Sequence, residues 1–210
     1  MSATTDAAVL TFGEQGDVRI GAITLDAIAR PEFRVDTPWG SANVRLAVSG
    51  RHMAWNAAAA LAVAGVVTGS IDAAATALAT AGVSGKRMQI DRAPSGAIVV
   101  NDAYNANPDS MRAALDALAA ISAVRRVAVL GAMGELDDAD SGHARVATDA
   151  AERGIELMAV GTDRYGVEPV AASATDFDPA VLGPLDAGVA VLVKASNSVG
   201  LWAVAERLLR

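Results

Sequence analysis

Apolar runs of strand length alternate with helix-periodic segments from Met88 to the end of this chain. Strands are predicted near residues 88–92, 97–101, 126–131, 156–161 and 189–194, and helices near 108–122, 141–153 and 198–209. Such alternation favours crossover connections and a mainly parallel sheet. We therefore predict an α/β fold with a Rossmann-like, mainly parallel sheet. Residues 162–188 are the least readable part of the sequence.

The first 84 residues have a different pattern. Glycine and proline separate short β-rich runs, at residues 9–12, 18–25, 33–35 and 43–48. Such runs indicate antiparallel strands and hairpins. Two helices are predicted next, at about 53–68 and 71–81, the second with Ser70 as its N-cap and Gly82 as its end.

A short glycine-containing segment, residues 82–87, lies where the two patterns meet. It lacks the four-residue gap and the hydroxyl after the lysine that a phosphate-binding loop of the Gly-x-x-x-x-Gly-Lys-Ser/Thr kind requires. We interpret it as a hinge that divides the chain into a domain at 1–84 and a domain at 85–210, and we expect proteases to cut first after Lys86 or Arg87.

The polar stretch from Asn101 to Ser110 directly follows a predicted strand. In an open parallel sheet, ligands bind at the carboxyl ends of the strands. Asn107 is a good N-cap, and Pro108 is a good first residue for the helix that follows. Turn formation alone accounts for any one of these polar residues. The whole stretch offers several donors and acceptors around Tyr104, so we expect a binding loop.

Composition excludes several classes of function. The net charge is −7 and only two residues are lysine, whereas nucleic-acid binding requires clustered cations. No apolar run approaches the roughly 20 residues of a membrane span, and the first residues lack the features of a signal peptide. Without cysteine there is no disulfide framework. We expect a cytoplasmic, monomeric protein that binds no nucleic acid and no membrane.

Five segments, in the same order along the chain, resemble motifs of the Mur ligases. Asn101–Ser110 is similar to the Asp-x-Tyr-Asn-Ala-Asn-Pro-Asp-Ser signature of the members that add D-alanyl-D-alanine. The other matching segments are Gly50 to His52 with Asn56, residues 85–88, residues 127–136 with His143, and residues 191–196. The resemblance implies that residues 1–84 end a central ATP-binding domain and that residues 85–210 form the C-terminal domain.

The resemblance also implies a reaction. Mur ligases form a peptide bond in peptidoglycan precursors by phosphorylating a carboxylate with ATP, in the presence of Mg²⁺, so that an amine can attack the acyl phosphate. D-Ala-D-Ala would be the amine donor and UDP-N-acetylmuramoyl-tripeptide the acceptor. The phosphate loop and the UDP-sugar domain of the family have no counterpart in this sequence. We expect the missing part of the ligase to make most of the contacts with ATP and Mg²⁺. The chain alone is expected to be an inactive fragment of a peptide synthase.

Three residues correspond to family positions that contact ATP. The resemblance places Asn56 at the adenine, Asp102 at the ribose hydroxyls and Arg87 at the phosphates. Without the resemblance, Asn56 would be a solvated helix residue, Asp102 a turn residue and Arg87 an ordinary surface charge.

Five further residues are predicted to bind the substrate: Tyr104, Asn105, Asn107, Lys194 and Ser196. The first three offer neutral donors and acceptors for the carboxylate and amide of D-Ala-D-Ala, although Asn107 is also explained as a helix cap. Lys194 and Ser196 follow an apolar strand, and Lys194 is otherwise explained as a solvated strand-terminal charge. We assign no catalytic residue to this chain.

Roles are also predicted for the two histidines, and four residues depart from the family pattern. His52 is expected to brace the ATP pocket and His143 to pack or cap near its helix, and their separation fits no metal site. Met53, Ala132, Ala195 and Asn197 differ from the common family residues, which leaves the role of residues 194–197 open.

Two alternatives remain. One is a sister ligase, of the Mur type or the polyglutamate type, with another amine donor. The sequence of the 101–110 loop argues against it. The other is a non-catalytic or dinucleotide-binding Rossmann domain. No Gly-x-Gly-x-x-Gly follows a strand, and the glycine spacing at residues 131–134 is wrong for one.

Overall fold

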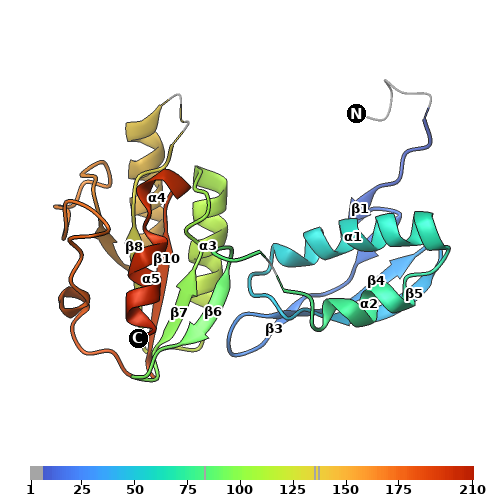
Figure 1. Cartoon of the computed structure of the whole chain (residues 1–210). Helices are drawn as coiled ribbons and strands as arrows, with labels where there is room; N and C mark the ends of the chain where they lie inside the picture. Colours follow the sequence, from blue (N-terminus) through green and yellow to red (C-terminus); the bar gives the residue numbers. More distant parts are fainter. Residues whose placement is uncertain (1–6, 83, 135, 137) are drawn as a thin grey trace. The chain divides into compact units, whose positions relative to one another are not determined.

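The chain forms two compact units in the computed structural model, which describes residues 7–82, 84–134, 136 and 138–210 (Figure 1). Unit 1 comprises Met1–Asp26 and Arg30–Gly82, and unit 2 comprises Ala27–Ala29 and Val83–Arg210. Each unit has its own cluster of buried apolar residues. The division falls inside the segment 82–87, of which Val83 lies outside the described residues, and the hinge there stays a prediction.

Unit 1 contains a five-stranded sheet in the order β1-β2-β4-β3, with β5 also paired to β4. The strands are β1 (Phe12–Gly13), β2 (Val18–Ile20), β3 (Thr24–Leu25), β4 (Pro31–Thr37) and β5 (Gly40–Arg45). Pairing is antiparallel as expected, except that β1 runs parallel to β2. Pro31, expected to separate strands, is instead the first residue of β4, a strand position that proline tolerates.

Two helices follow this sheet, α1 (Met53–Thr68) and α2 (Asp72–Leu78). The predicted bounds of α1 are confirmed. The second helix is shorter than predicted, because Ile71 is its N-cap and it ends before Gly82 is reached. The Ser70 hydroxyl still accepts a hydrogen bond from the Asp72 N–H at 3.2 Å, so its polar side chain supports the start of the helix without being the cap residue.

The two sides of α1 are both apolar. Ala54, Ala58 and Leu61 are buried in the core of unit 1. On another side, Val63, Val66 and Val67 are exposed, and together with Leu10 and Phe12 from the start of the chain they line an apolar groove of about 340 Å³. A helix that is apolar all round is typical of a protein interior. Among the described helices, none combines the length and the apolar character that crossing a membrane requires.

Gly65 of α1 provides a test of packing in unit 1. Alanine in a helix interior is normally about 1 kcal/mol more favourable than glycine. Here a Cβ at Gly65 would overlap the ring of Trp39. We expect Gly65→Ala to lower the free energy of unfolding of unit 1 by about 1–3 kcal/mol, because Trp39 must move. Urea denaturation measures this change. Gly82→Ala, where an added Cβ meets nothing within 4 Å, is the control, and a stabilising Gly65→Ala would contradict the packing argument.

Unit 2 contains a five-stranded sheet in the order β6-β7-β10-β8-β9. Its strands are β6 (Gln89–Arg92), β7 (Ile98–Asn101), β8 (Arg125–Leu130), β9 (Glu156–Ala159) and β10 (Val189–Lys194). All neighbouring pairs are parallel except β6 with β7. The predicted Rossmann-like, mainly parallel sheet is therefore confirmed, with β6 joined to β7 as an antiparallel edge strand because only a short turn, residues 93–97, connects them.

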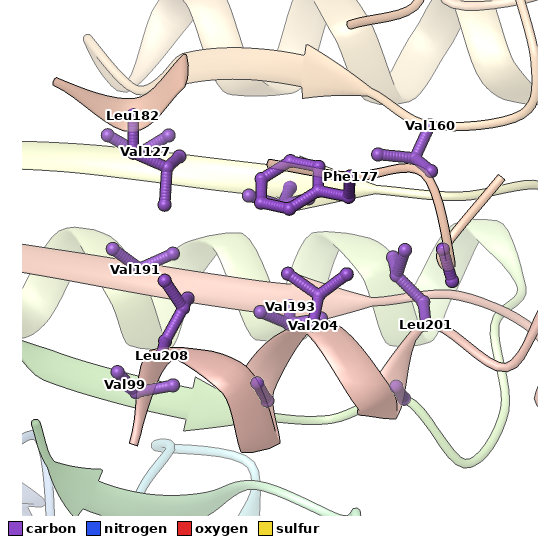
Figure 2. Packing of buried hydrophobic residues seen from close by; sticks show 14 of the residues in the cluster. Val99, Val127, Val160, Phe177, Leu182, Val191, Val193, Leu201, Val204 and Leu208 are labelled. Carbon is purple, nitrogen blue, oxygen red and sulfur yellow. The ribbon is translucent and has the colours of Figure 1, made fainter. Parts of the chain in front are cut away.

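The helices of unit 2 are α3 (Pro108–Ala120), α4 (Ala139–Glu152) and α5 (Trp202–Leu208). The last one begins later than predicted, because a short 3-10 turn, η3 (Asn197–Val199), ends at Gly200 in the left-handed conformation. Between Thr162 and Gly188 the backbone is irregular, with turns and one short 3-10 helix, η2 (Pro179–Leu182). Phe177 and Leu182 from this segment are buried in the cluster that also holds Val191 of β10 and Val204 of α5 (Figure 2).

Candidate functional site

Three neighbouring strands of unit 2 end at the same edge of the sheet. β10 lies between β7 and β8, with Val193 opposite Asn101 and Lys194 opposite Leu130. The segments that leave these strand ends are residues 102–107, 131–134 and 195–196. Parallel strands thus bring together the loops in which most of the predicted site residues lie.

Lys194 and Asp102 form a buried ion pair at this edge. The Lys194 Nζ lies 2.6 Å from Asp102 Oδ2, and the two side chains are 3% and 13% exposed. Nζ also donates to the main-chain oxygens of Asn105, at 2.8 Å, and of Asp102, at 3.4 Å. The second carboxylate oxygen, Oδ1, accepts a hydrogen bond from the Met88 N–H at 2.9 Å. Lys194 therefore directs its ammonium group at the 102–105 loop and holds the shape of that loop.

The asparagines of the loop also bond within it. Asn101 Oδ1 accepts from the Ala103 N–H at 3.3 Å, and Asn105 Oδ1 accepts from the Ala106 N–H at 2.9 Å. Asn107 is the N-cap of α3, as predicted, and forms a capping box with Ser110. Asn105 and Asn107 are exposed, whereas Asn101 is buried. Short-range bonds thus fix the backbone while two of the asparagines face solvent at the strand edge.

Two cations before β6 rest on aromatic rings. The Arg87 guanidinium lies 3.8 Å from the centre of the Tyr104 ring, and the Lys86 ammonium lies 3.8 Å from the centre of the Trp202 ring. The Tyr104 N–H also donates to the Lys86 carbonyl at 3.0 Å. The predicted nucleotide residue Arg87 and the predicted substrate residue Tyr104 are therefore in direct contact.

Ser196 and His143 hold the turn that follows β8. Ser196 Oγ accepts a hydrogen bond from the Gly134 N–H at 2.7 Å. His143 is fully buried, and its Nε2 accepts from the Met133 N–H at 3.0 Å while Nδ1 lies 2.5 Å from the Ala139 carbonyl. These contacts require a neutral ring with the proton on Nδ1. The packing role expected of His143 fits this geometry, and Glu135 of the same motif lies outside the described residues.

Tyr165 belongs to this site, and the sequence did not predict it. Its hydroxyl donates to the Gly131 carbonyl at 2.8 Å, and its ring contacts His143 edge-on with centroids 4.8 Å apart. Burial raises the pKa of the Tyr165 hydroxyl above its ordinary value, so that it remains a donor. Tyr165 lies in residues 162–188, where no periodic pattern marks it as a site residue.

Asn56 and His52 lie in unit 1. Asn56 is exposed in the first turn of α1, and its Nδ2 lies 3.4 Å from the Met53 Sδ. The His52 ring covers Gly50, which has a φ of 106°, so that a Cβ there would be both strained and blocked. This packing explains the Gly-x-His spacing. The adenine contact of Asn56 and the bracing role of His52 stay predictions.

A scan of family models matches residues 86–197 to the Mur ligase, glutamate ligase domain. The chain belongs to the Mur ligase family. The UDP-N-acetylmuramoyl-tripeptide–D-alanyl-D-alanine ligase of Mycobacterium tuberculosis (strain ATCC 25618 / H37Rv) is 40% identical over an alignment 227 positions long. This alignment covers 92% of this chain and 44% of that protein.

Solved Mur ligase structures share the fold. A crystal structure of MurF from Acinetobacter baumannii superposes with a TM-score of 0.82 at 29% identity, covering 95% of this chain and 46% of that one. MurF from Thermotoga maritima in complex with ADP superposes with a TM-score of 0.77 at 21% identity, covering 95% of this chain and 48% of that one. The chain thus spans less than half the length of these relatives.

Proposed function

We propose that this chain is the C-terminal part of an ATP-dependent, ADP-forming ligase that joins D-Ala-D-Ala to UDP-N-acetylmuramoyl-tripeptide in peptidoglycan biosynthesis. The observation that carries the proposal is the 101–110 loop, which Lys194 holds at the carboxyl edge of a parallel sheet and which has the sequence typical of the D-Ala-D-Ala-adding Mur ligases. The name of the Mycobacterium tuberculosis relative supports this substrate pair.

The apolar outer side of α1 supports the fragment assignment. Val63, Val66 and Val67 are 65%, 65% and 75% exposed, and the matched relatives are more than twice as long as the aligned segment. We infer that a further part of the ligase packs on this side of α1. That part would also contain the phosphate loop and make most of the contacts with ATP and Mg²⁺. Among the described residues no group of three or more acidic, histidine or cysteine side chains could hold a metal ion.

Asp102 has the chemistry to bind the ribose of ATP. Each of its carboxylate oxygens accepts one hydrogen bond from the chain, from Met88 and from Lys194. A carboxylate has about four acceptor positions, so the same group has capacity for ribose hydroxyls. In the proposal, Asn56 contacts the adenine and Arg87 the phosphates, as the family resemblance implies.

Tyr104, Asn105, Asn107 and Ser196 form the proposed D-Ala-D-Ala surface. Their neutral donors and acceptors would orient the dipeptide amine toward the acyl phosphate, and such positioning can supply a large part of the rate enhancement. For Lys194 the geometry supports a role through the loop that it holds, because its Nζ already donates to three loop oxygens. A direct contact between Lys194 and the substrate stays a prediction.

The chain alone is expected to hydrolyse no ATP and to form no peptide bond. Catalysis of phosphoryl transfer depends on groups that hold the β- and γ-phosphates, and in the proposal these belong to the missing part. Phosphate release is compared with a buffer control, with and without D-Ala-D-Ala and the UDP-tripeptide. Release well above the control would contradict the assignment of the phosphate loop to another segment.

Asp102→Asn is expected to raise the KM for ATP about tenfold in a complete ligase, made by exchanging the matching segment of the M. tuberculosis relative for this chain. The substitution keeps an acceptor for the Met88 N–H but removes the charged acceptor for the ribose, a loss of roughly 1–2 kcal/mol. Steady-state kinetics at saturating D-Ala-D-Ala measure the effect, and circular dichroism checks that the variant is folded. An unchanged ATP dependence would assign Asp102 to loop structure only.

A further inference from the structure

Tyr104 and Arg87 form one stacked pair, although the sequence assigned them to different ligands. The guanidinium lies 3.8 Å from the centre of the ring. We infer that Tyr104 is a positioning residue for Arg87: its ring is the platform that presents the guanidinium to an anionic phosphate. This inference rests on the proposed function, in which Arg87 contacts the nucleotide phosphates.

The backbone around Arg87 is folded so that its side chain reaches the ring. Lys86 and Met88, on either side of Arg87, have φ values of 66° and 46°. Such values are uncommon for residues other than glycine and persist where surrounding contacts hold them. Here the Lys86 carbonyl accepts from the Tyr104 N–H, and the Met88 N–H donates to Asp102. Both neighbours of Arg87 are thus tied to the loop that carries Tyr104.

The platform itself is fixed from the other side. Lys194 donates to Asp102 and to Asn105, the two ends of the segment that contains Tyr104. Tyr104 as a whole residue is 43% exposed, so the pair that it forms with Arg87 lies where solvent and solutes can reach it. Lys86 over the ring of Trp202 provides a second contact between residues 86–88 and the rest of unit 2.

A stacked arginine remains able to bind an anion. A guanidinium that stacks on an aromatic ring uses its planar face, and its N–H groups, which lie in the plane, stay available to pair with two phosphate oxygens. Stacking restricts the rotamers of the long arginine side chain, so less conformational entropy is lost when a phosphate binds. This role requires the aromatic ring of Tyr104 and does not require its hydroxyl group.

Nuclear magnetic resonance of the 210-residue chain tests the platform without any activity. The Arg87 Hδ protons are expected to be shifted upfield by the Tyr104 ring. Tyr104→Phe should preserve this shift and Tyr104→Leu should abolish it. Trp202→Leu, the matched control, should change the Lys86 signals and leave those of Arg87. An Arg87 signal without an upfield shift in the unaltered chain would overturn the inference.

Kinetics of the complete ligase test the function of the pair. Tyr104→Leu should raise the KM for ATP about 2- to 5-fold, the range expected from losing an exposed cation–π contact, and Tyr104→Phe should leave it unchanged. If Tyr104→Phe raises the KM for ATP as much as Tyr104→Leu does, or if Tyr104→Leu leaves the KM for ATP unchanged, the positioning role is wrong. A complete ligase with no D-Ala-D-Ala activity would contradict the proposed function, while the resonance experiment would still decide the platform.

Discussion

Replacing Lys194 with methionine is expected to lower the free energy of unfolding of unit 2 by about 3–5 kcal/mol, because removing one partner of a buried ion pair leaves an uncompensated charge. The Asp102 side chain, 13% exposed, loses its counter-charge. The main-chain oxygen of Asn105 loses a donor in the same substitution. Urea denaturation followed by circular dichroism measures the change.

A double variant and a surface control make this prediction specific. Lys194→Met combined with Asp102→Asn should recover a large part of the loss, since the buried charge is then removed with its partner. Arg164→Met breaks a pair with Asp140 whose side chains are 48% and 87% exposed, and should cost less than about 1 kcal/mol. If Lys194→Met costs no more than Arg164→Met, Lys194 does not hold the loop.

Phe177→Ala is expected to destabilise unit 2 by about 3–5 kcal/mol, the usual cost of removing a buried aromatic side chain. Phe177 is 2% exposed and is part of the cluster with Val191, Val193 and Val204 (Figure 2). The same denaturation experiment measures the effect. Val124→Ala, at a side chain that is 92% exposed, is the control and should change stability by less than about 0.5 kcal/mol. Equal effects of the two substitutions would show that residues 162–188 do not close the core.

The regular elements of the fold could be predicted because each buries one periodic face. The apolar runs of β7, β8 and β10 and the helical spacing in α3 mark their positions within a few residues. Phe177 and Leu182 could not be predicted as core residues, because they lie in irregular backbone where no period links them to the sheet. The parallel pairing of β1 with β2 likewise depends on contacts that a local pattern does not encode.

Part of the candidate site could be predicted in the same way. The position of the 101–110 loop after a strand, and Asn107 as a cap, follow from local sequence. The pairing of Lys194 with Asp102 joins residues 92 positions apart, and the stacking of Arg87 on Tyr104 joins two separate motifs. Such contacts can be predicted only when the strand order of the sheet is known. Local sequence patterns do not give that order, so these contacts could not be predicted.

A ligation assay with the complete ligase tests the central claim most directly. The enzyme is incubated with ATP, UDP-N-acetylmuramoyl-tripeptide and either D-Ala-D-Ala, L-Ala-L-Ala or single amino acids, and the products are identified by mass spectrometry together with the ADP released. We expect ATP-dependent formation of the pentapeptide product with D-Ala-D-Ala, together with ADP, and little product with the other donors. A folded enzyme that binds nucleotide but prefers another amine donor, or forms no product with D-Ala-D-Ala, would contradict the proposed function.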